Sequence, residues 1–257
     1  MNFKTLLNFR DLGGVPAMDN KKLRRGLIFR SANPDNLSMR DISRLRSLNI
    51  RTIVDLRSPE EAAGKKVILD HAANISLPLD FQLKTRERLR PVIYKNHAEE
   101  AIAEISNALY LEILDAAVPV FGQVMEILDS SAQIPILVHC QAGKDRTGII
   151  SALVMRAMGV PGEFIIKDFM KSNPALSSYF RKRFLIRSVL TLGFFPYSNL
   201  LFAVTVKRRN IESVLERVER HYGGIEAYLS ASGFDLSKLP GIRQRLLEDT
   251  SSGQDGG

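Results

Sequence analysis

The stretch that decides the fold is H-C-Q-A-G-K-D-R-T-G at residues 139–148, which holds the only cysteine of the chain, Cys140. Residues 134–138 before it are typical of a short buried strand, and residues 147–158 after it have helical periodicity. Cys140 therefore opens a tight loop that leads into a helix N-terminus, and Arg146 closes it. Backbone amides and the helix dipole at such a loop favour a thiolate and an anionic ligand. Since a guanidinium binds two phosphate oxygens, the stretch predicts a phosphate site with a sulfur nucleophile.

The whole stretch resembles the signature of the cysteine-dependent protein tyrosine phosphatases. The pair Lys144-Asp145 narrows the resemblance to the branch of bacterial and fungal tyrosine/serine and lipid phosphatases. Similar segments run from residue 8 to residue 248, and they are N-F-R-D-L-G-G at 8–14, F-R-S at 29–31, V-D-L-R-S at 54–58, K-D-F-M-K-S-N at 167–173 and H-Y-G-G at 221–224. The resemblance implies a phosphoric-monoester hydrolase that works through a phosphocysteine intermediate, without a cofactor or a metal. Its substrate would be a phosphotyrosine or phosphoserine/threonine protein, or a phosphoinositide.

Such a reaction needs an acid, because an alkoxide is a poor leaving group unless it is protonated. The resembling family places an aspartate after an L-P-type segment, and here Asp80 follows L-P-L at residues 77–79. Asp80 is therefore the first candidate, and a carboxylate that fixes a strand-end turn is the structural alternative. Asp145 inside the loop is the competing acid, or else it orients water or fixes Arg146.

The remaining loop residues are expected to contact the substrate, and they are Gln141, Ala142, Gly143, Lys144 and Thr147. Lys144 would add charge for a second phosphate or an inositol ring, unless it is a solvated loop lysine. Thr147 could donate its hydroxyl to the thiolate or to the phosphate, and it also stands where a helix cap would.

Supporting roles are expected for His139, Asp11 and Asp55. His139 would hydrogen-bond within the base of the loop, or it is merely a buried polar spacer. Buried ion pairs are expected to brace the N-terminal segment, formed by Arg10, Asp11, Asp55 and Arg57. Asp168 and Asn173 are expected to fix a helix turn.

Alternating strand and helix patterns predict an α/β fold, with a central, mostly parallel sheet flanked by helices and a helical C-terminal part. Strands are expected at 23–30, 50–56, 75–79 and 136–139, and helices from residue 38, from residue 58 and over 97–128. Residues 1–250 are expected to form one phosphatase domain and 251–257 a disordered tail. Segment 177–206 would be a mobile helical lid over the Cys140 pocket, or else a fixed core helix pair.

The composition of the chain limits the cellular compartments and the binding partners that can be expected. The chain has 257 residues and one cysteine, so it can form no intramolecular disulfide, which fits the cytoplasm. No secretory signal is apparent, although export by another route stays open. No Cys/His cluster has metal-site spacing. The net charge of +8 fits anionic substrates, and no nucleic-acid module is present. Basic clusters at 180–184 and 207–209 leave contact with an anionic membrane surface open, while nothing indicates an oligomeric state.

Three other interpretations compete with the hydrolase. Cys140 could be an ordinary buried core cysteine. A rhodanese-like sulfurtransferase also holds a cysteine in an anion-binding loop, but it does not need Arg146 followed by Thr147. A non-catalytic phospho-ligand binding module usually lacks the cysteine or the arginine, and this chain has both.

Overall fold

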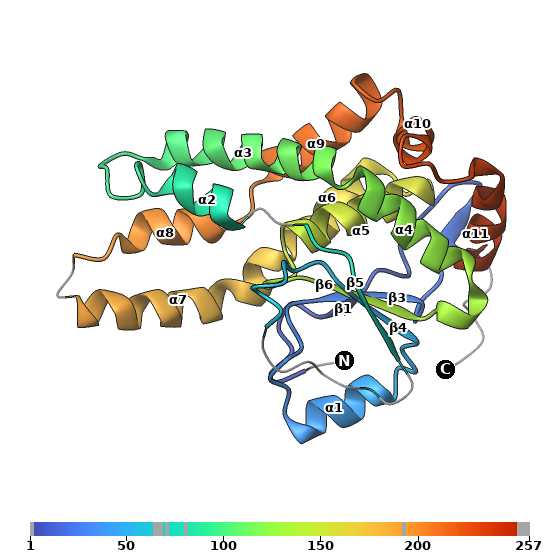
Figure 1. Cartoon of the computed structure of the whole chain (residues 1–257), viewed down its shortest axis with the longest axis horizontal. Coiled ribbons are helices and arrows are strands. Elements are labelled where there is room, and N and C mark those ends of the chain that lie inside the picture. The colour runs from blue at the N-terminus through green and yellow to red at the C-terminus, as the bar shows by residue number, and fades with distance from the viewer. Residues whose placement is uncertain (1–2, 64–68, 70–71, 80–81, 192–193, 251–257) are drawn as a thin grey trace.

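The computed structural model describes residues 3–63, 69, 72–79, 82–191 and 194–250, and its centre is a five-stranded sheet (Figure 1). The strands lie in the order β1-β3-β6-β4-β5, and their bounds are β1 (Arg10–Asp11), β3 (Ile28–Ser31), β4 (Thr52–Asp55), β5 (Ala73–Ser76) and β6 (Ile136–His139). Four strands are parallel, and β1 is antiparallel at the edge. The fully buried β6 lies in the middle and sets His139 beside Ser31 and Asp55. The loops after the parallel strands β3, β4 and β6 therefore meet at one edge of the sheet, beside Cys140.

A second, two-stranded sheet corrects the strand expected at 23–30. β2 (Lys21–Leu23) pairs antiparallel with β7 (Leu247–Asp249), so Leu23 and Ile28 belong to different sheets. Gly26 turns the chain between them with φ +79°, and the Asp11 carboxylate accepts a hydrogen bond from its amide at 2.7 Å. A glycine in the left-handed region ends the strand. The strand β7 was not predicted, since its partner lies more than 200 residues away.

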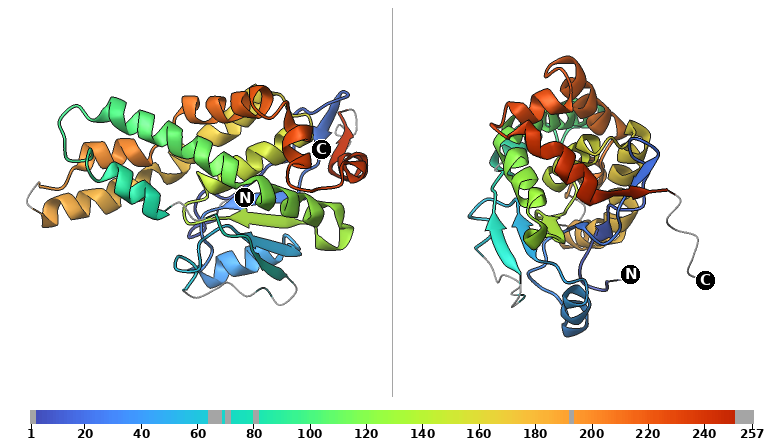
Figure 2. Two further views of the ribbon diagram at one scale, coloured as in Figure 1. Left: turned by 45° about the horizontal axis from the view of Figure 1, so that its top comes forward. Right: turned by 90° about the vertical axis from the view of Figure 1, so that its right-hand side faces the viewer.

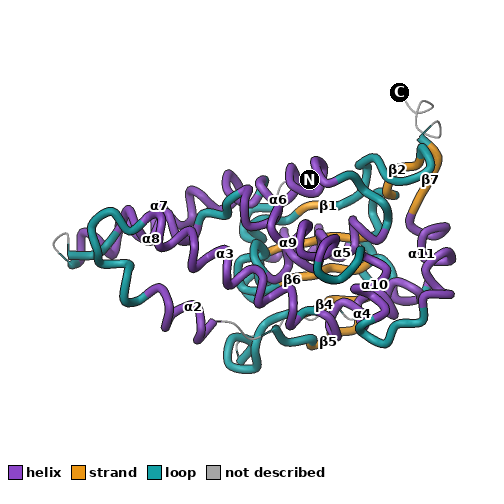
Figure 3. The backbone as a smooth tube through the Cα atoms, turned by 90° about the horizontal axis from the view of Figure 1, so that it is seen from above, coloured by secondary structure: helices purple, strands orange, loops and turns teal. Residues whose placement is uncertain are grey.

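Helices cover both faces of the main sheet (Figures 1 and 3). One face carries α1 (Met39–Arg46), which begins as predicted, with the Ser38 hydroxyl accepting from the Asp41 amide at 3.2 Å. The other face carries α3 (Glu99–Ala116), α4 (Val118–Asp129), α5 (Arg146–Ala157), α6 (Gly162–Met170), α9 (Arg208–Arg220), α10 (Ile225–Ser230) and α11 (Leu239–Leu246). Short 3-10 turns span Ser131–Gln133 and Leu236–Lys238.

Two helix predictions need correction. The helical stretch expected at 97–128 is two helices, because Pro119 lies in the first turn of α4 and cannot continue α3. The helix expected from Ser58 is a single turn within the described residues, closed by a bond from the Ala62 amide to the Ser58 carbonyl. Its capping contacts are present, since the Ser58 amide donates to the Glu61 carboxylate at 3.1 Å and the Glu61 amide donates to the Ser58 hydroxyl at 3.4 Å.

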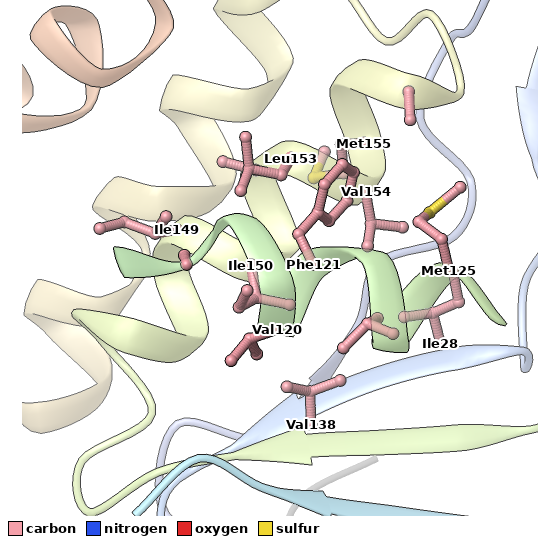
Figure 4. Packing of buried hydrophobic residues seen from close by; sticks show 14 of the residues in the cluster. Ile28, Val120, Phe121, Met125, Val138, Ile149, Ile150, Leu153, Val154 and Met155 are labelled. Carbon is pink, nitrogen blue, oxygen red and sulfur yellow. The ribbon is translucent and has the colours of Figure 1, made fainter. Parts of the chain in front are cut away.

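Helix α5 lies in the densest part of the core (Figure 4). Ile150 and Val154 pack between Phe121 of α4 and the sheet residues Ile28 and Val138, and all five are essentially buried. Burying apolar side chains is the main favourable term in folding, at about 25 cal/mol per Å². Because α5 is enclosed on nearly every side, its N-terminus and the loop that leads into it are held in place.

Helices α7 (Ser172–Leu190) and α8 (Tyr197–Val204) form an extension that we call the arm, and it projects beyond the sheet (Figures 1 and 2). It lies beside α2 (Gln82–Leu89) and α3, and Asn199 of α8 donates to the carbonyl of Ile93 at 2.8 Å. At its base Asn173 exchanges two hydrogen bonds with the backbone of Val206, rather than fixing a helix turn. Among the described residues, no helix combines the length and apolar character that crossing a bilayer requires.

Candidate active site

Cys140 lies at the carboxyl end of β6 and opens the loop that leads into α5. Only 2% of its surface is exposed. Gly143 in the middle of the loop has φ +65°, and a Cβ atom there would lie 2.1 Å from the carbonyl oxygen of Ser31. No other residue fits this conformation and this close approach together. The loop is therefore pressed against the end of β3.

Donors from outside the loop hold its carbonyl groups. The Asn8 amide donates to the carbonyls of Ala142 and Gly143 at 3.2 and 2.8 Å, and Nη2 of Arg30 donates to that of Gly143 at 2.8 Å. In a trans peptide the C=O and the N–H point in opposite directions. With those carbonyls turned toward Asn8 and Arg30, the amides of Gly143 and Lys144 face the opposite side. Such an arrangement of amides suits an anion.

One carboxylate, Asp168 of α6, binds Arg30 directly and supports Asn8 through Arg10, whose Nη1 donates to Oδ1 of Asn8 at 2.6 Å. Oδ2 of Asp168 lies 2.8 Å from Nη1 of Arg30, and its Oδ1 lies 2.7 Å from Nε of Arg10. Burial lowers the pKa of Arg30 to about 10, and the nearby Arg10 adds to this. Burial alone would raise the pKa of Asp168, but the two arginines lower it below its ordinary value. Asp168 thus stabilises a buried charge cluster behind the loop, which differs from the helix-turn role expected for it.

Arg146 is the first residue of α5, and Glu61 binds its guanidinium end-on. Nη1 and Nη2 lie 2.5 and 2.8 Å from the two carboxylate oxygens, and Nη1 also donates to the carbonyls of Leu56 and Leu79. Burial alone would lower the pKa of Arg146, but the hydrogen bonds to Glu61 raise it further above its ordinary value. An end-on pair leaves the edge formed by Nε and the outer N–H of Nη2 for a second, bidentate partner.

Asp145 precedes α5, and its carboxylate is bound from two sides. It accepts hydrogen bonds from the hydroxyl of Tyr110 on α3 and from Nζ of Lys144, the latter at 2.7 Å. Burial alone would raise the pKa of Asp145, but the charge of Lys144 and these two hydrogen bonds lower it. Burial and the Asp145 charge raise the pKa of Tyr110 well above its ordinary value. Tyr110 therefore stays a neutral hydroxyl donor, and the three side chains form one hydrogen-bonded unit around the Asp145 carboxylate.

His139 and Asp55 lie behind the loop rather than in it. Burial lowers the pKa of His139 to about 4, although Asp55, whose Oδ1 is 3.8 Å from Nδ1, opposes the change. Asp55 is bound by Arg57, with Nη2 to Oδ2 at 2.7 Å, and Arg57 also binds Asp35 at 2.6 Å. The expected ion pair of Asp55 with Arg57 is thus present. Asp11 accepts backbone amides instead of a cation.

Thr147 and Asp80 are two further residues that the sequence predicted to act in the site. Thr147 lies in the first turn of α5 and not at the cap, which Asp145 occupies; its buried hydroxyl has no hydrogen-bond partner in the described part of the chain. The donation of that hydroxyl to the thiolate stays a prediction. Asp80 lies outside the described residues, as does the expected tail at 251–257. Leu79, next to Asp80 in the sequence, places its carbonyl 3.2 Å from Nη1 of Arg146.

A pocket of about 220 Å³ opens over the loop. Its floor contains Cys140, Gln141, Ala142 and Lys144, all expected to face the substrate, together with Arg146. Helices α2, α3 and α8 supply its walls, through Thr85, Arg86, Leu89, Ser106, Leu109, Tyr110, Ile113 and Ala203. Among the described residues of the segment expected to be a lid, Ala203 alone lines the pocket, and the arm projects beyond the sheet (Figure 1). Whether the arm is a mobile lid stays a prediction.

Sequence reasoning missed several members of the site, namely Asn8, Arg30, Glu61 and Tyr110. Asn8 and Arg30 belong to the segments N-F-R-D-L-G-G and F-R-S, which were noticed as similar but were given no role. Glu61 follows the D-L-R-S segment, and its position after β4 at the same sheet edge as Cys140 was the available signal. Tyr110 lies within a long helix and carried no signal.

Comparisons with known proteins complete the description of the site. A model described as the tyrosine phosphatase family matches residues 1–248. A candidate tyrosine-protein phosphatase of Cupriavidus necator is 26% identical over 243 residues, which covers 93% of this chain and 86% of that protein. The triple specificity protein phosphatase PtpB of Mycobacterium tuberculosis is 26% identical over 274 residues, covering 93% and 96%. Among solved structures, the core catalytic domain of the PP-IP phosphatase SIW14 of S. cerevisiae has a TM-score of 0.38 and 17% identity, covering 66% of this chain and 79% of that one.

Proposed function

This chain belongs to the tyrosine phosphatase family, and we propose that it hydrolyses phosphate monoesters by attack of the Cys140 thiolate on phosphorus. The observation that carries this mechanism is the arrangement of the loop. Its carbonyls are held outward by Asn8 and Arg30, its amides face the other way, and Arg146 keeps one edge free. These groups are suited to the equatorial oxygens of a phosphoryl group in the transition state.

The reaction has two steps. In the first, an S–P bond forms, the ester P–O bond breaks, and the leaving oxygen takes a proton from a carboxylic acid. In the second, a water oxygen attacks the phosphocysteine, a carboxylate takes the water proton, and the S–P bond breaks to return the thiolate and release phosphate. Arg146 serves both steps, because the phosphoryl oxygens whose negative charge it neutralises are present in each.

We assign the acid role in the first step to Asp80. Leu79, its neighbour in sequence, contacts Arg146, which supports an acid that reaches the pocket from the chain segment after β5. Asp145 is less suited to donate a proton, because Lys144 and Tyr110 hold it ionised. An ionised carboxylate next to the loop is suited to orient the attacking water or to keep Lys144 in place.

For the substrate we propose phosphotyrosine in proteins first. The walls of the pocket combine apolar side chains from Leu89, Leu109 and Ile113 with the ring of Tyr110, and these surroundings favour an aromatic leaving group. Arg86 and Lys144 add positive charge at the same pocket. The name of the mycobacterial relative records triple specificity, so phosphoserine proteins and phosphoinositides belong in the same test.

The test is a substrate panel with the purified protein and its Cys140→Ser variant. A phosphotyrosine peptide, a phosphoserine peptide and a short-chain phosphoinositide are compared by released phosphate, in buffer containing EDTA. We expect turnover only with the cysteine, since a serine hydroxyl is barely ionised at neutral pH. A serine variant that regains activity when a divalent metal replaces the EDTA, or a wild-type protein inactive on all three substrates, would contradict the proposal.

A further inference from the structure

Exposed apolar side chains gather at the far end of α7. Of the eight large hydrophobic side chains that are exposed among the described residues, six lie between Tyr179 and Phe194. We call five of them the arm tip, namely Leu185, Ile186, Val189, Leu190 and Phe194. Leu190 is 77% exposed and Phe194 85%. An exposed apolar patch of this kind marks a surface that meets another apolar phase.

The arm tip is one surface. Leu185 and Val189, and likewise Ile186 and Leu190, are four residues apart on α7 and so lie on adjoining rows of the helix. The opposite side of α7 is occupied, because Phe184 is buried and its ring packs against those of Phe180 and Phe195. The inward side therefore packs within the arm, while the outward side is exposed.

The net charge of +8 arises within residues 169–211, a segment that contains the arm. Residues 169–211 contain eight lysines and arginines and no aspartate or glutamate. The other 28 lysines and arginines of the total of 36 equal the 28 aspartates and glutamates of the chain. Three of the eight, Arg181, Lys182 and Arg187, are exposed within or beside the arm tip, and none of them forms an ion pair in the described structure. Four of the eight, Arg181, Lys182, Arg183 and Arg187, lie on α7, and the other four flank the arm, so the arm and the residues next to it are cationic.

The place of the arm tip suits contact with a large, flat partner. It lies at the end of the arm that points away from the sheet (Figures 1 and 2), and none of its residues lines the Cys140 pocket. We propose that the arm tip docks onto an anionic membrane surface, with its apolar side chains in the headgroup–acyl boundary and its cations on lipid phosphates and carboxylates. This inference does not depend on which phosphoester the enzyme hydrolyses.

A second copy of the chain fits the arm tip less well. Apolar side chains alone would suit a two-fold contact, in which the same patch meets itself. Such a contact would also bring Lys182 and Arg187 of one copy toward those of the other, and like charges across an interface are unfavourable. An anionic bilayer accepts the apolar side chains and neutralises the cations together.

The test is co-sedimentation of the full chain with vesicles of phosphatidylcholine, with or without phosphatidylserine. We expect binding to the anionic vesicles that weakens as salt is raised. Leu190→Ser with Phe194→Ser should weaken it about tenfold or more, because two large apolar side chains no longer enter the bilayer. Lys182→Ala with Arg187→Ala should weaken it about 30-fold, because each cation near such a surface contributes about 1 kcal/mol.

Matched controls use exposed residues away from the arm. Met39→Ser replaces an apolar side chain that is 75% exposed on α1, and Arg40→Ala with Arg51→Ala removes two exposed cations. These variants should bind vesicles like the wild type, and all variants should keep the wild-type hydrolysis of p-nitrophenyl phosphate in solution. Equal loss in the arm and control variants, or equal binding to neutral vesicles, would overturn the inference. So would a concentration-dependent dimer in sedimentation velocity that the Leu190/Phe194 variant abolishes, if vesicles bind no protein.

Discussion

The carboxylate of Glu61 holds the guanidinium of Arg146 end-on, with N–O distances of 2.5 and 2.8 Å. Glu61 comes from the segment after β4 and Arg146 from the start of α5, so this pair joins two loops at the same sheet edge. The pair fixes which edge of the guanidinium faces the pocket.

We expect Glu61→Gln to lower kcat/KM for p-nitrophenyl phosphate about 10- to 100-fold, since a small misplacement of a binding group has effects of this size. Steady-state kinetics measures the loss, with circular dichroism to confirm folding. The matched control is Glu60→Gln, because Glu60 is exposed and its carboxylate accepts from the nearby Ser58 hydroxyl rather than from Arg146. If both variants behave alike, Glu61 does not position Arg146.

Asp80→Asn should lower kcat by about 10² or more on a phosphoserine peptide, whose alkoxide needs a proton to leave. On p-nitrophenyl phosphate the loss should be smaller, because that leaving group is stable without a proton. Asp145→Asn serves as the comparison, and its effect should be similar on both substrates. The acid would have to be Asp145 if only that variant shows a loss that depends on the leaving group.

Lys144→Ala should reduce turnover of phosphoinositides more than turnover of phosphotyrosine peptides. An added cation matters most where the substrate carries additional phosphates. Lys144→Arg keeps the charge and should retain most of the lipid activity. An equal decrease on both substrate types would mean that Lys144 acts on the reacting phosphoryl group or on Asp145, its 2.7 Å partner.

Asp168→Asn should destabilise the protein by about 3–5 kcal/mol at pH 7, because it leaves Arg30 buried without its counterion. The folded-state pKa of Asp168 is lowered, so its contribution is present above the ordinary carboxyl range near pH 4 and is lost as the pH falls through the folded value. Urea unfolding at pH 7 and at pH 3 should therefore show a difference from wild type that shrinks at pH 3. The control is the exposed Asp19→Asn, and a difference that is unchanged at pH 3 would contradict the assignment.

The sequence predicted the central part of the fold well, because its signals are local. The strand at 136–139, the loop and the helix that ends at Gly159 are confirmed, and so is the Ser38 cap of α1. Hydrophobic periodicity and capping residues act within a few positions of one another. The family and the α/β class follow from the same features.

The parts that failed depend on contacts between distant residues. The turn at Gly26 divides an apolar run between two sheets, and β7 is a strand only because β2 pairs with it. Glu61 makes the local contact with the Ser58 amide that its position predicts, but its contact with Arg146, 85 residues later, has no local signal. Roles for Asn8, Arg30 and Asp168 were likewise not visible, since each contacts a segment far away in the chain.

The loop carbonyls are held by the side chains of Asn8 and Arg30, and Asp168, the counterion of Arg30, follows Cys140 by 28 positions. Contacts of such sequence separation form late in folding, because loop-closure entropy opposes them. A nascent chain that has emerged only as far as α5 already contains every group of the signature, but it has no counterion for Arg30 and no helix α6 beside it. We therefore expect ribosome-bound chains that end before residue 168 to carry an unassembled, inactive Cys140. Activity is therefore expected to appear during translation only after α6 has been made.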